Sequence, residues 1–133
     1  MKFLGVIIEE SLVNKKILAE VEIVYTVIEK VTPLHQTPWL TMWTKHTVQI
    51  PESEINIFSE MLSLQFDRSH TNWYADFKNE LFHFIVFPEK VFRIARINVE
   101  EYQVVVEYGK SLGIPEHQLG FSLAGAELQG DKL

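Results

Sequence analysis

The sequence contains no cysteine among its 133 residues. Disulfide bonds, thiolate catalysis and cysteine-based zinc sites are therefore excluded. A chain without cysteine fits a reducing compartment, and we expect a cytoplasmic protein. The five histidines show none of the spacings that are typical of metal-binding helices, so the sequence indicates no metal site and no cofactor.

Basic residues and long apolar runs are also scarce. Twelve Lys and Arg stand against 18 Asp and Glu, which gives a net charge of −6. This balance argues against nucleic acid as a partner, because phosphate backbones are bound by clustered basic side chains. No apolar run approaches the ~20 residues of a membrane span, and the apolar stretch at the start is too short for a signal peptide. We therefore expect no membrane partner.

The chain does contain a succession of short apolar patterns that fits one α+β domain. A period of two residues predicts strands over 3–8, 21–31, 42–50 and 91–97 and a hairpin over 73–87. A helix over 15–30 competes with the second of these strands. Pro51 and Asn98 precede a period of 3.6 residues, which predicts helices over about 53–66 and 99–112.

This order of elements predicts a single antiparallel-rich sheet with helices packed on one face. The expected arrangement is ferredoxin-like with an added strand. We expect the domain to span residues 1–120. Residues 121–133 are small, polar and weakly patterned, which is typical of a loosely structured C-terminal tail.

The predicted hairpin carries the best candidate site in the chain. One face is apolar, and the other gathers the polar side chains Tyr74, Asp76, Lys78 and His83. The two turns that we considered, Lys78-Asn79 and Asn79-Glu80, both keep Asp76 and His83 on the same face. A three-residue turn over 88–90 then adds Arg93 to that polar face.

Two interpretations fit this face. In the first, Asp76 orients the imidazole of His83 for acid–base catalysis, while Lys78 and Arg93 hold a small anionic ligand. In the second, the face is a solvated sheet surface with weak cross-strand ion pairs, which is the commoner arrangement. No serine stands in a nucleophile elbow, so the sequence supports acid–base chemistry at most.

Apolar residues outside the core pattern suggest contacts with a ligand or partner. Trp39 and Trp43 flank the end of the proline-containing connection 32–41, where they either form an aromatic wall for a ligand or pin the loop to the core. In residues 81–87 every side chain except His83 is apolar. Such a face needs a cover, from the tail, from the 32–41 loop or from a second copy. We expect a homodimer that buries Leu81, Ile85 and Phe87.

Three segments, 73–79, 37–39 and 113–118, resemble signatures of a small uncharacterised prokaryotic protein family; they read WYADFKN, TPW and GIPEHQ. The resemblance covers about residues 3–121 and implies a compact, stand-alone cytoplasmic domain. It implies no activity and no functional residues. The leading hypothesis is therefore a non-catalytic binding or interaction domain that acts as a homodimer. The alternative is an acid–base enzyme that uses Asp76 and His83 on a small anionic substrate.

Overall fold

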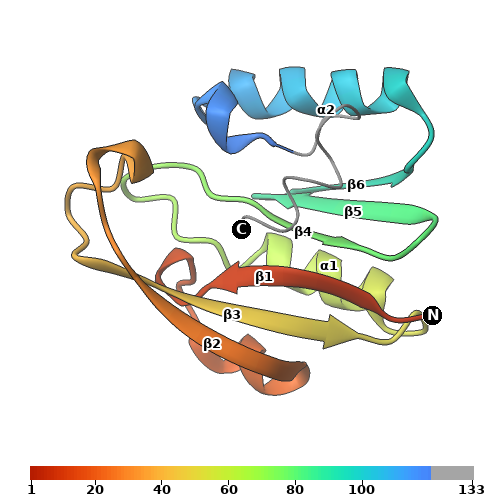
Figure 1. The fold of residues 1–133 in the computed structure, drawn as a ribbon, viewed down its shortest axis with the longest axis horizontal. Coiled ribbons are helices and arrows are strands. Elements are labelled where there is room, and N and C mark those ends of the chain that lie inside the picture. Colours follow the sequence, from red (N-terminus) through yellow and green to blue (C-terminus); the bar gives the residue numbers. More distant parts are fainter. Residues whose placement is uncertain (121–133) are drawn as a thin grey trace.

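The computed structural model describes residues 1–120, which form one six-stranded sheet with the strand order β2-β3-β1-β4-β5-β6 (Figure 1). Every neighbouring pair of strands is antiparallel. The strands are β1 (Phe3–Ile8), β2 (Glu22–Lys30), β3 (Met42–Ile50), β4 (Ala75–Lys78), β5 (Phe82–Phe87) and β6 (Lys90–Ala95). The two α-helices are α1 (Ile55–Ser63) and α2 (Val99–Ser111). The predicted α+β class and both predicted helices are confirmed.

Apolar side chains project from both faces of β5, and each face packs under a different helix. Phe84 and Val86 belong to the core under α1, whereas Ile85 and Phe87 belong to a second core under α2. The helices therefore lie on opposite sides of the sheet, with β5 between them (Figure 1). The prediction of helices on one face was wrong, because a strand that is apolar on both faces needs a cover on each.

The ferredoxin-like arrangement is not confirmed. Only short 3₁₀ turns, Glu9–Ser11 and Lys15–Glu20, connect β1 to β2, where that arrangement needs an α-helix. No strand follows α2 within residues 1–120. The segment 21–31, for which a helix was the alternative, is strand β2. The predicted tail 121–133 lies outside the described residues.

The face that was expected to form a dimer interface is buried within the chain itself. Ile85 and Phe87 are completely inaccessible beneath α2, and Leu81 alone of the three stays exposed. Residues 99–119 therefore provide the cover that the sequence analysis assigned to a second copy. None of the helices in the described part is long and apolar enough to cross a membrane.

Turn geometry decides which side chains share a face with Asp76. The β4–β5 turn lies at Glu80-Leu81, where the Asn79 side chain accepts hydrogen bonds from the Leu81 and Phe82 amides at 2.9 and 2.8 Å. This turn is one residue beyond the nearer predicted turn, yet it is also a two-residue loop. The predicted faces of the hairpin are therefore preserved.

The β5–β6 turn differs from the prediction in a way that matters. It consists of Pro88 and Glu89 alone, since Phe87 pairs directly with Lys90. This loop is one residue shorter than predicted, so every side chain of β6 points to the face opposite the expected one. Arg93 consequently lies on the α1 side, with its guanidinium 4.0 Å from the centre of the Phe82 ring. The assignment of Arg93 to the polar face was wrong.

Candidate functional site

A chain of three polar side chains runs from the interior toward the surface of the sheet. His83 on β5 is fully buried; its Nε2 lies 2.6 Å from Oδ2 of Asp76 on β4, and its Nδ1 lies 2.8 Å from the hydroxyl of Tyr102 on α2. The predicted contact between Asp76 and His83 is confirmed. A neutral imidazole satisfies both bonds when Tyr102 donates to Nδ1 and Nε2–H donates to the carboxylate.

The electrostatic setting keeps Tyr102 protonated. Burial raises the pKa of Tyr102 to about 12, because the ionised phenol loses its hydration, and the nearby Asp76 carboxylate acts in the same direction. The Arg96 guanidinium opposes this effect but does not cancel it. Tyr102 therefore remains a donor to His83 throughout the neutral range, and the imidazole in turn stays oriented toward Asp76.

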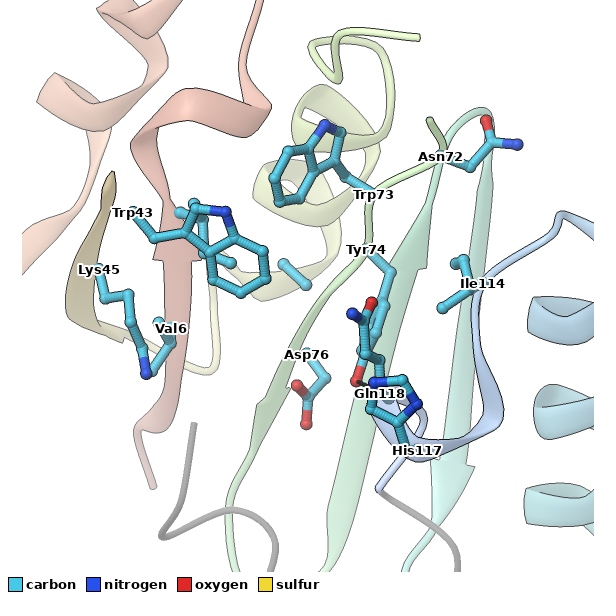
Figure 2. Close-up of a pocket in the computed structure, with 12 residues that line it drawn as sticks. Val6, Trp43, Lys45, Asn72, Trp73, Tyr74, Asp76, Ile114, His117 and Gln118 are labelled. Atoms are coloured by element: carbon cyan, nitrogen blue, oxygen red, sulfur yellow. Dashed lines mark hydrogen bonds between the residues drawn. The ribbon is translucent and has the colours of Figure 1, made fainter. Parts of the chain in front are cut away.

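Asp76 lies at the wall of a cavity of about 170 Å³ on the α2 side of the sheet (Figure 2). The side chain is 11 % exposed. Its second oxygen, Oδ1, makes no hydrogen bond with any residue of the described range 1–120. The cavity is lined by Val6, Ile8, Trp43, Lys45, Asn72, Trp73, Tyr74, Ala75, Asp76, Ile114, His117 and Gln118.

The segment that closes one side of this cavity, residues 114–118, is held in place by a part of the chain far away in the sequence. The turn Glu116–Gln118 docks on the turn Pro33–His35 through three hydrogen bonds of 3.1 Å, in which the His117 and Gln118 side chains donate to the carbonyls of Leu34 and His35. The Tyr74 hydroxyl donates to the carbonyl of Gln118. These bonds fix the 114–118 segment against the sheet, and the wall of the cavity is completed by β1, β3 and residues 72–76.

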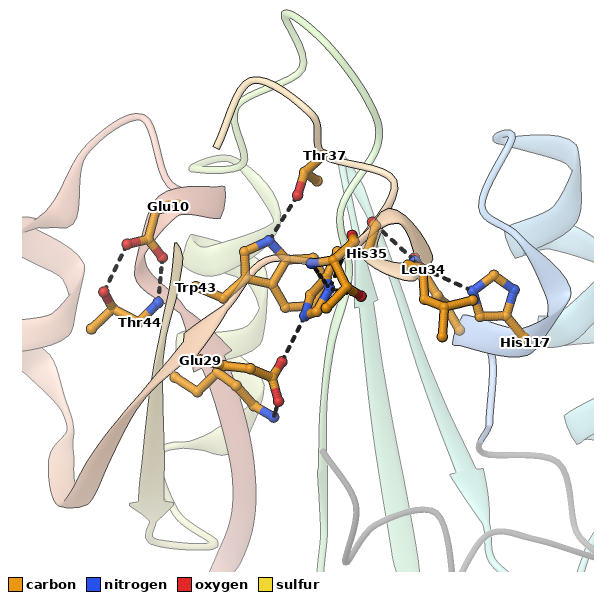
Figure 3. A network of polar contacts seen from close by, with 11 residues as sticks. Glu10, Glu29, Leu34, His35, Thr37, Trp43, Thr44 and His117 are labelled. Carbon is orange, nitrogen blue, oxygen red and sulfur yellow. Dashed lines mark hydrogen bonds and ion pairs between the residues drawn. The ribbon is translucent and has the colours of Figure 1, made fainter. Parts of the chain in front are cut away.

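The indole of Trp43 is held from both sides (Figure 3). Its Nε1 donates to Oγ1 of Thr37 at 3.0 Å, and the ring of His35 meets it edge-on with a centroid distance of 4.3 Å. His35 Nε2 lies 2.8 Å from Glu29, whose other oxygen lies 3.6 Å from the ammonium of Lys45. The hydrogen bond from His35 is the main cause that lowers the pKa of Glu29. Lys45 therefore enters the cavity wall as part of an ion pair.

The structure brings some of the predicted site residues together and separates others. Tyr74, Asp76 and Trp43 line the cavity, while His83 stands behind Asp76. Lys78 lines a different depression, together with Lys2 and Arg96. Trp39 stacks on His70 with a centroid distance of 4.3 Å and is not a lining residue.

The sequence analysis missed most of the lining residues, among them Lys45, Trp73 and His117. The signal for Lys45 was available, because alternation along β3 places it on the same face as Trp43. Trp73 belongs to the apolar face of the hairpin and packs in the core, but its ring also meets Trp43 at a centroid distance of 5.4 Å. Nothing in the sequence pattern links His117 to the hairpin.

The described residues hold no group of three or more His, Asp or Glu side chains arranged to bind a metal ion. Comparison with known proteins finds no matching family model, no similar curated protein and no similar solved structure. The family resemblance of the segments WYADFKN and GIPEHQ therefore stays a prediction. Both segments contribute to the cavity wall, the first through residues 73–76 and the second through Ile114, His117 and Gln118.

Proposed function

We propose that this chain is a small-molecule binding domain and that its ligand occupies the cavity beside Asp76. The observation that carries the proposal is Oδ1 of Asp76, which accepts no hydrogen bond from residues 1–120. The other oxygen of this carboxylate is held in place by His83. Oδ1 borders the cavity and is not enclosed by the protein, so a donor that enters the cavity can reach it. A ligand that brings such a donor gains a charge-assisted hydrogen bond without having to order Asp76.

The lining supports a small amine as the ligand. The apolar walls come from aromatic side chains, Trp43, Trp73 and Tyr74, which suit a flat apolar body and also attract a cation through their ring faces. The volume of about 170 Å³ is close to the ~150 Å³ of an engineered cavity that holds benzene. We therefore infer a ligand with about one ring and an ammonium or amidinium group directed at Asp76.

The acid–base alternative is less well supported. A general base must touch the proton that it removes, but His83 is inaccessible and both its ring nitrogens are engaged. The expected anionic substrate also loses its basis, because Arg93 lies on the opposite face and Lys78 lines another depression. His83 thus acts as a positioning residue for Asp76.

Benzylamine is a suitable probe, since Trp43 and Trp73 provide a fluorescence signal inside the cavity. We expect binding at about millimolar affinity and, in Asp76→Asn, at least ~10-fold weaker binding from the loss of one charge-assisted contact. Asp67→Asn makes the same change on a surface turn, where Asp67 bonds Ser69, and should bind benzylamine as the native chain does. Heteronuclear NMR spectra would show that both variants remain folded.

Benzyl alcohol and benzoate separate the possible outcomes. Weaker binding of both than of benzylamine supports the amine assignment. Tighter binding of benzoate would restore the anionic ligand and overturn the role of Asp76. Binding of benzylamine that is equal in the native chain and in Asp76→Asn would refute the proposal.

A further inference from the structure

Strand β2 forms one edge of the sheet, and its outer side pairs with no strand within residues 1–120. It is nine residues long, and nearly all of it is exposed. Five of its large apolar side chains stay open to solvent: Ile23, Val24, Tyr25, Val27 and Ile28. An apolar strand with a free row of backbone donors and acceptors is a template for another strand.

The opposite edge of the sheet shows the protection that β2 lacks. Strand β6 is six residues long and carries exposed charges at Lys90 and Arg93. Short length and basic side chains are the usual means of blocking edge pairing. In β2, by contrast, no charge interrupts residues 23–28. Its one irregularity is a register shift between Ile23 and Tyr25.

We propose that β2 pairs with β2 of a second copy of this chain, antiparallel and across a two-fold axis at Thr26. A two-fold axis normal to the sheet keeps every side chain on its own face of the extended sheet. Such an axis must pass beside one residue of each strand, because an axis between two residues would pair side chains that point to opposite faces. With the axis at Thr26, Tyr25 faces Val27 of the second copy, which is a favourable aromatic and β-branched pair. The Glu22 end of one strand then lies near the Lys30 end of the other.

Neighbouring registers are poorer. An axis at Val27 sets Tyr25 opposite Glu29, and an axis at Ile28 sets Val27 opposite Glu29. These registers place Glu29 against an apolar residue two positions and one position from the axis, in the middle of the apolar stretch. The Thr26 register moves Glu29 three positions from the axis, opposite Ile23 at the end of that stretch. The two sheets then form one continuous sheet, and the cavity beside Asp76, which lies between β3 and the 114–118 segment, remains open. This assembly is thus independent of the proposed ligand.

Sedimentation velocity of the full chain over micromolar concentrations tests the interface. We expect a dimer, and in Ile28→Lys a dissociation constant raised by roughly 10-fold or more, because lysine on an edge strand opposes pairing. Leu81→Lys is the matched control: Leu81 is 62 % exposed and Ile28 66 %, and Leu81 belonged to the interface that the sequence predicted. A monomeric native chain, or dissociation by Leu81→Lys but not by Ile28→Lys, would overturn the proposal.

A single introduced cysteine tests the register, because the native chain has none. In Thr26→Cys the two thiols would face each other across the axis, with Cα atoms about 4.5–5.5 Å apart, which is within disulfide range. We expect a covalent dimer under mild oxidation. Glu29→Cys, three residues along the same strand, should form much less of it. Equal cross-linking of the two variants would contradict the Thr26 axis.

Discussion

Removal of the Tyr102 hydroxyl is the sharpest test of the buried polar chain. In Tyr102→Phe the ring keeps its place in the core under α2, where Tyr102 is 1 % exposed, but Nδ1 of His83 loses the partner at 2.8 Å. His83 is itself completely buried, so no water can take the place of the hydroxyl without a rearrangement. The variant thus removes the hydroxyl, with its contacts to His83 and Arg96, and leaves the ring unchanged.

The expected loss of stability in Tyr102→Phe comes mainly from Nδ1 of His83, which is left buried without a hydrogen-bond partner. A buried polar group left without a partner costs about 1–3 kcal/mol, and we expect the free energy of unfolding to fall by that amount. Tyr108→Phe is the matched control on the same helix. Its ring packs against Phe87 and Phe92, and its hydroxyl makes no hydrogen bond with residues 1–120, so we expect a change within about 0.5 kcal/mol.

Urea unfolding followed by tryptophan fluorescence measures both variants. An alkaline series adds a second readout, since the pKa of Tyr102 is raised from 10.0 to about 12. The unfolded chain releases this proton first, so the stability that Tyr102 contributes is lost as the pH rises from about 10 toward 12. Tyr102→Phe should reduce this loss, and Tyr74, whose pKa is also raised, should account for what remains. An equal loss of unfolding free energy in Tyr102→Phe and Tyr108→Phe would refute the stabilising role of the hydrogen bond between Tyr102 and His83.

Two further predictions concern the sheet and its acid sensitivity. Gly5→Ala should destabilise the chain by several kcal/mol and broaden the NMR signals of β4, because the new Cβ would collide with the backbone carbonyl of Asp76; a stable variant would show that β1 can move without disturbing the site. The pKa of Glu9 is lowered chiefly by its 2.8 Å hydrogen bond with His46, so its contribution to stability is present above pH 4.5 and is lost as the pH falls through the lower folded value. Glu9→Gln should reduce this acid dependence in urea titrations, and an unchanged pH profile would contradict the assignment.

Local chemistry explains which parts of the fold were predictable. Asn98 caps α2 by accepting from the Glu101 amide at 3.0 Å, and Gly113 leaves the helix with a φ of +85°. Both signals act between residues that are close in sequence, and the sequence analysis placed the start of this helix from Asn98. Strand β3 likewise spans Met42–Ile50 as expected, because the apolar alternation and Pro51 limit it without help from the rest of the chain.

The position of Arg93 could not be predicted from the local sequence. A turn of Pro88 and Glu89 alone requires Glu89 to adopt a φ of +60°, which is unfavourable for a residue with a side chain. The Glu89 amide donates to the carbonyl of Ser63 at the end of α1 at 2.9 Å, and Arg68 binds its carboxylate at 2.8 Å. These contacts from another element favour the shorter turn, and the shorter turn reverses every side chain of β6.

The sequence by itself determined the classes of the elements, the apolar and polar faces of the hairpin, and the meeting of Asp76 with His83, because periodicity and even loop lengths act over a few residues. Only the tertiary structure decided that α2 covers the second face of β5 and leaves β2 exposed. It alone decided the cavity, where the lining residue His117 is held by the carbonyl of Leu34, 83 residues away in the chain. Such contacts depend on how whole elements pack against one another, and no local pattern in the sequence predicts which distant segments will meet.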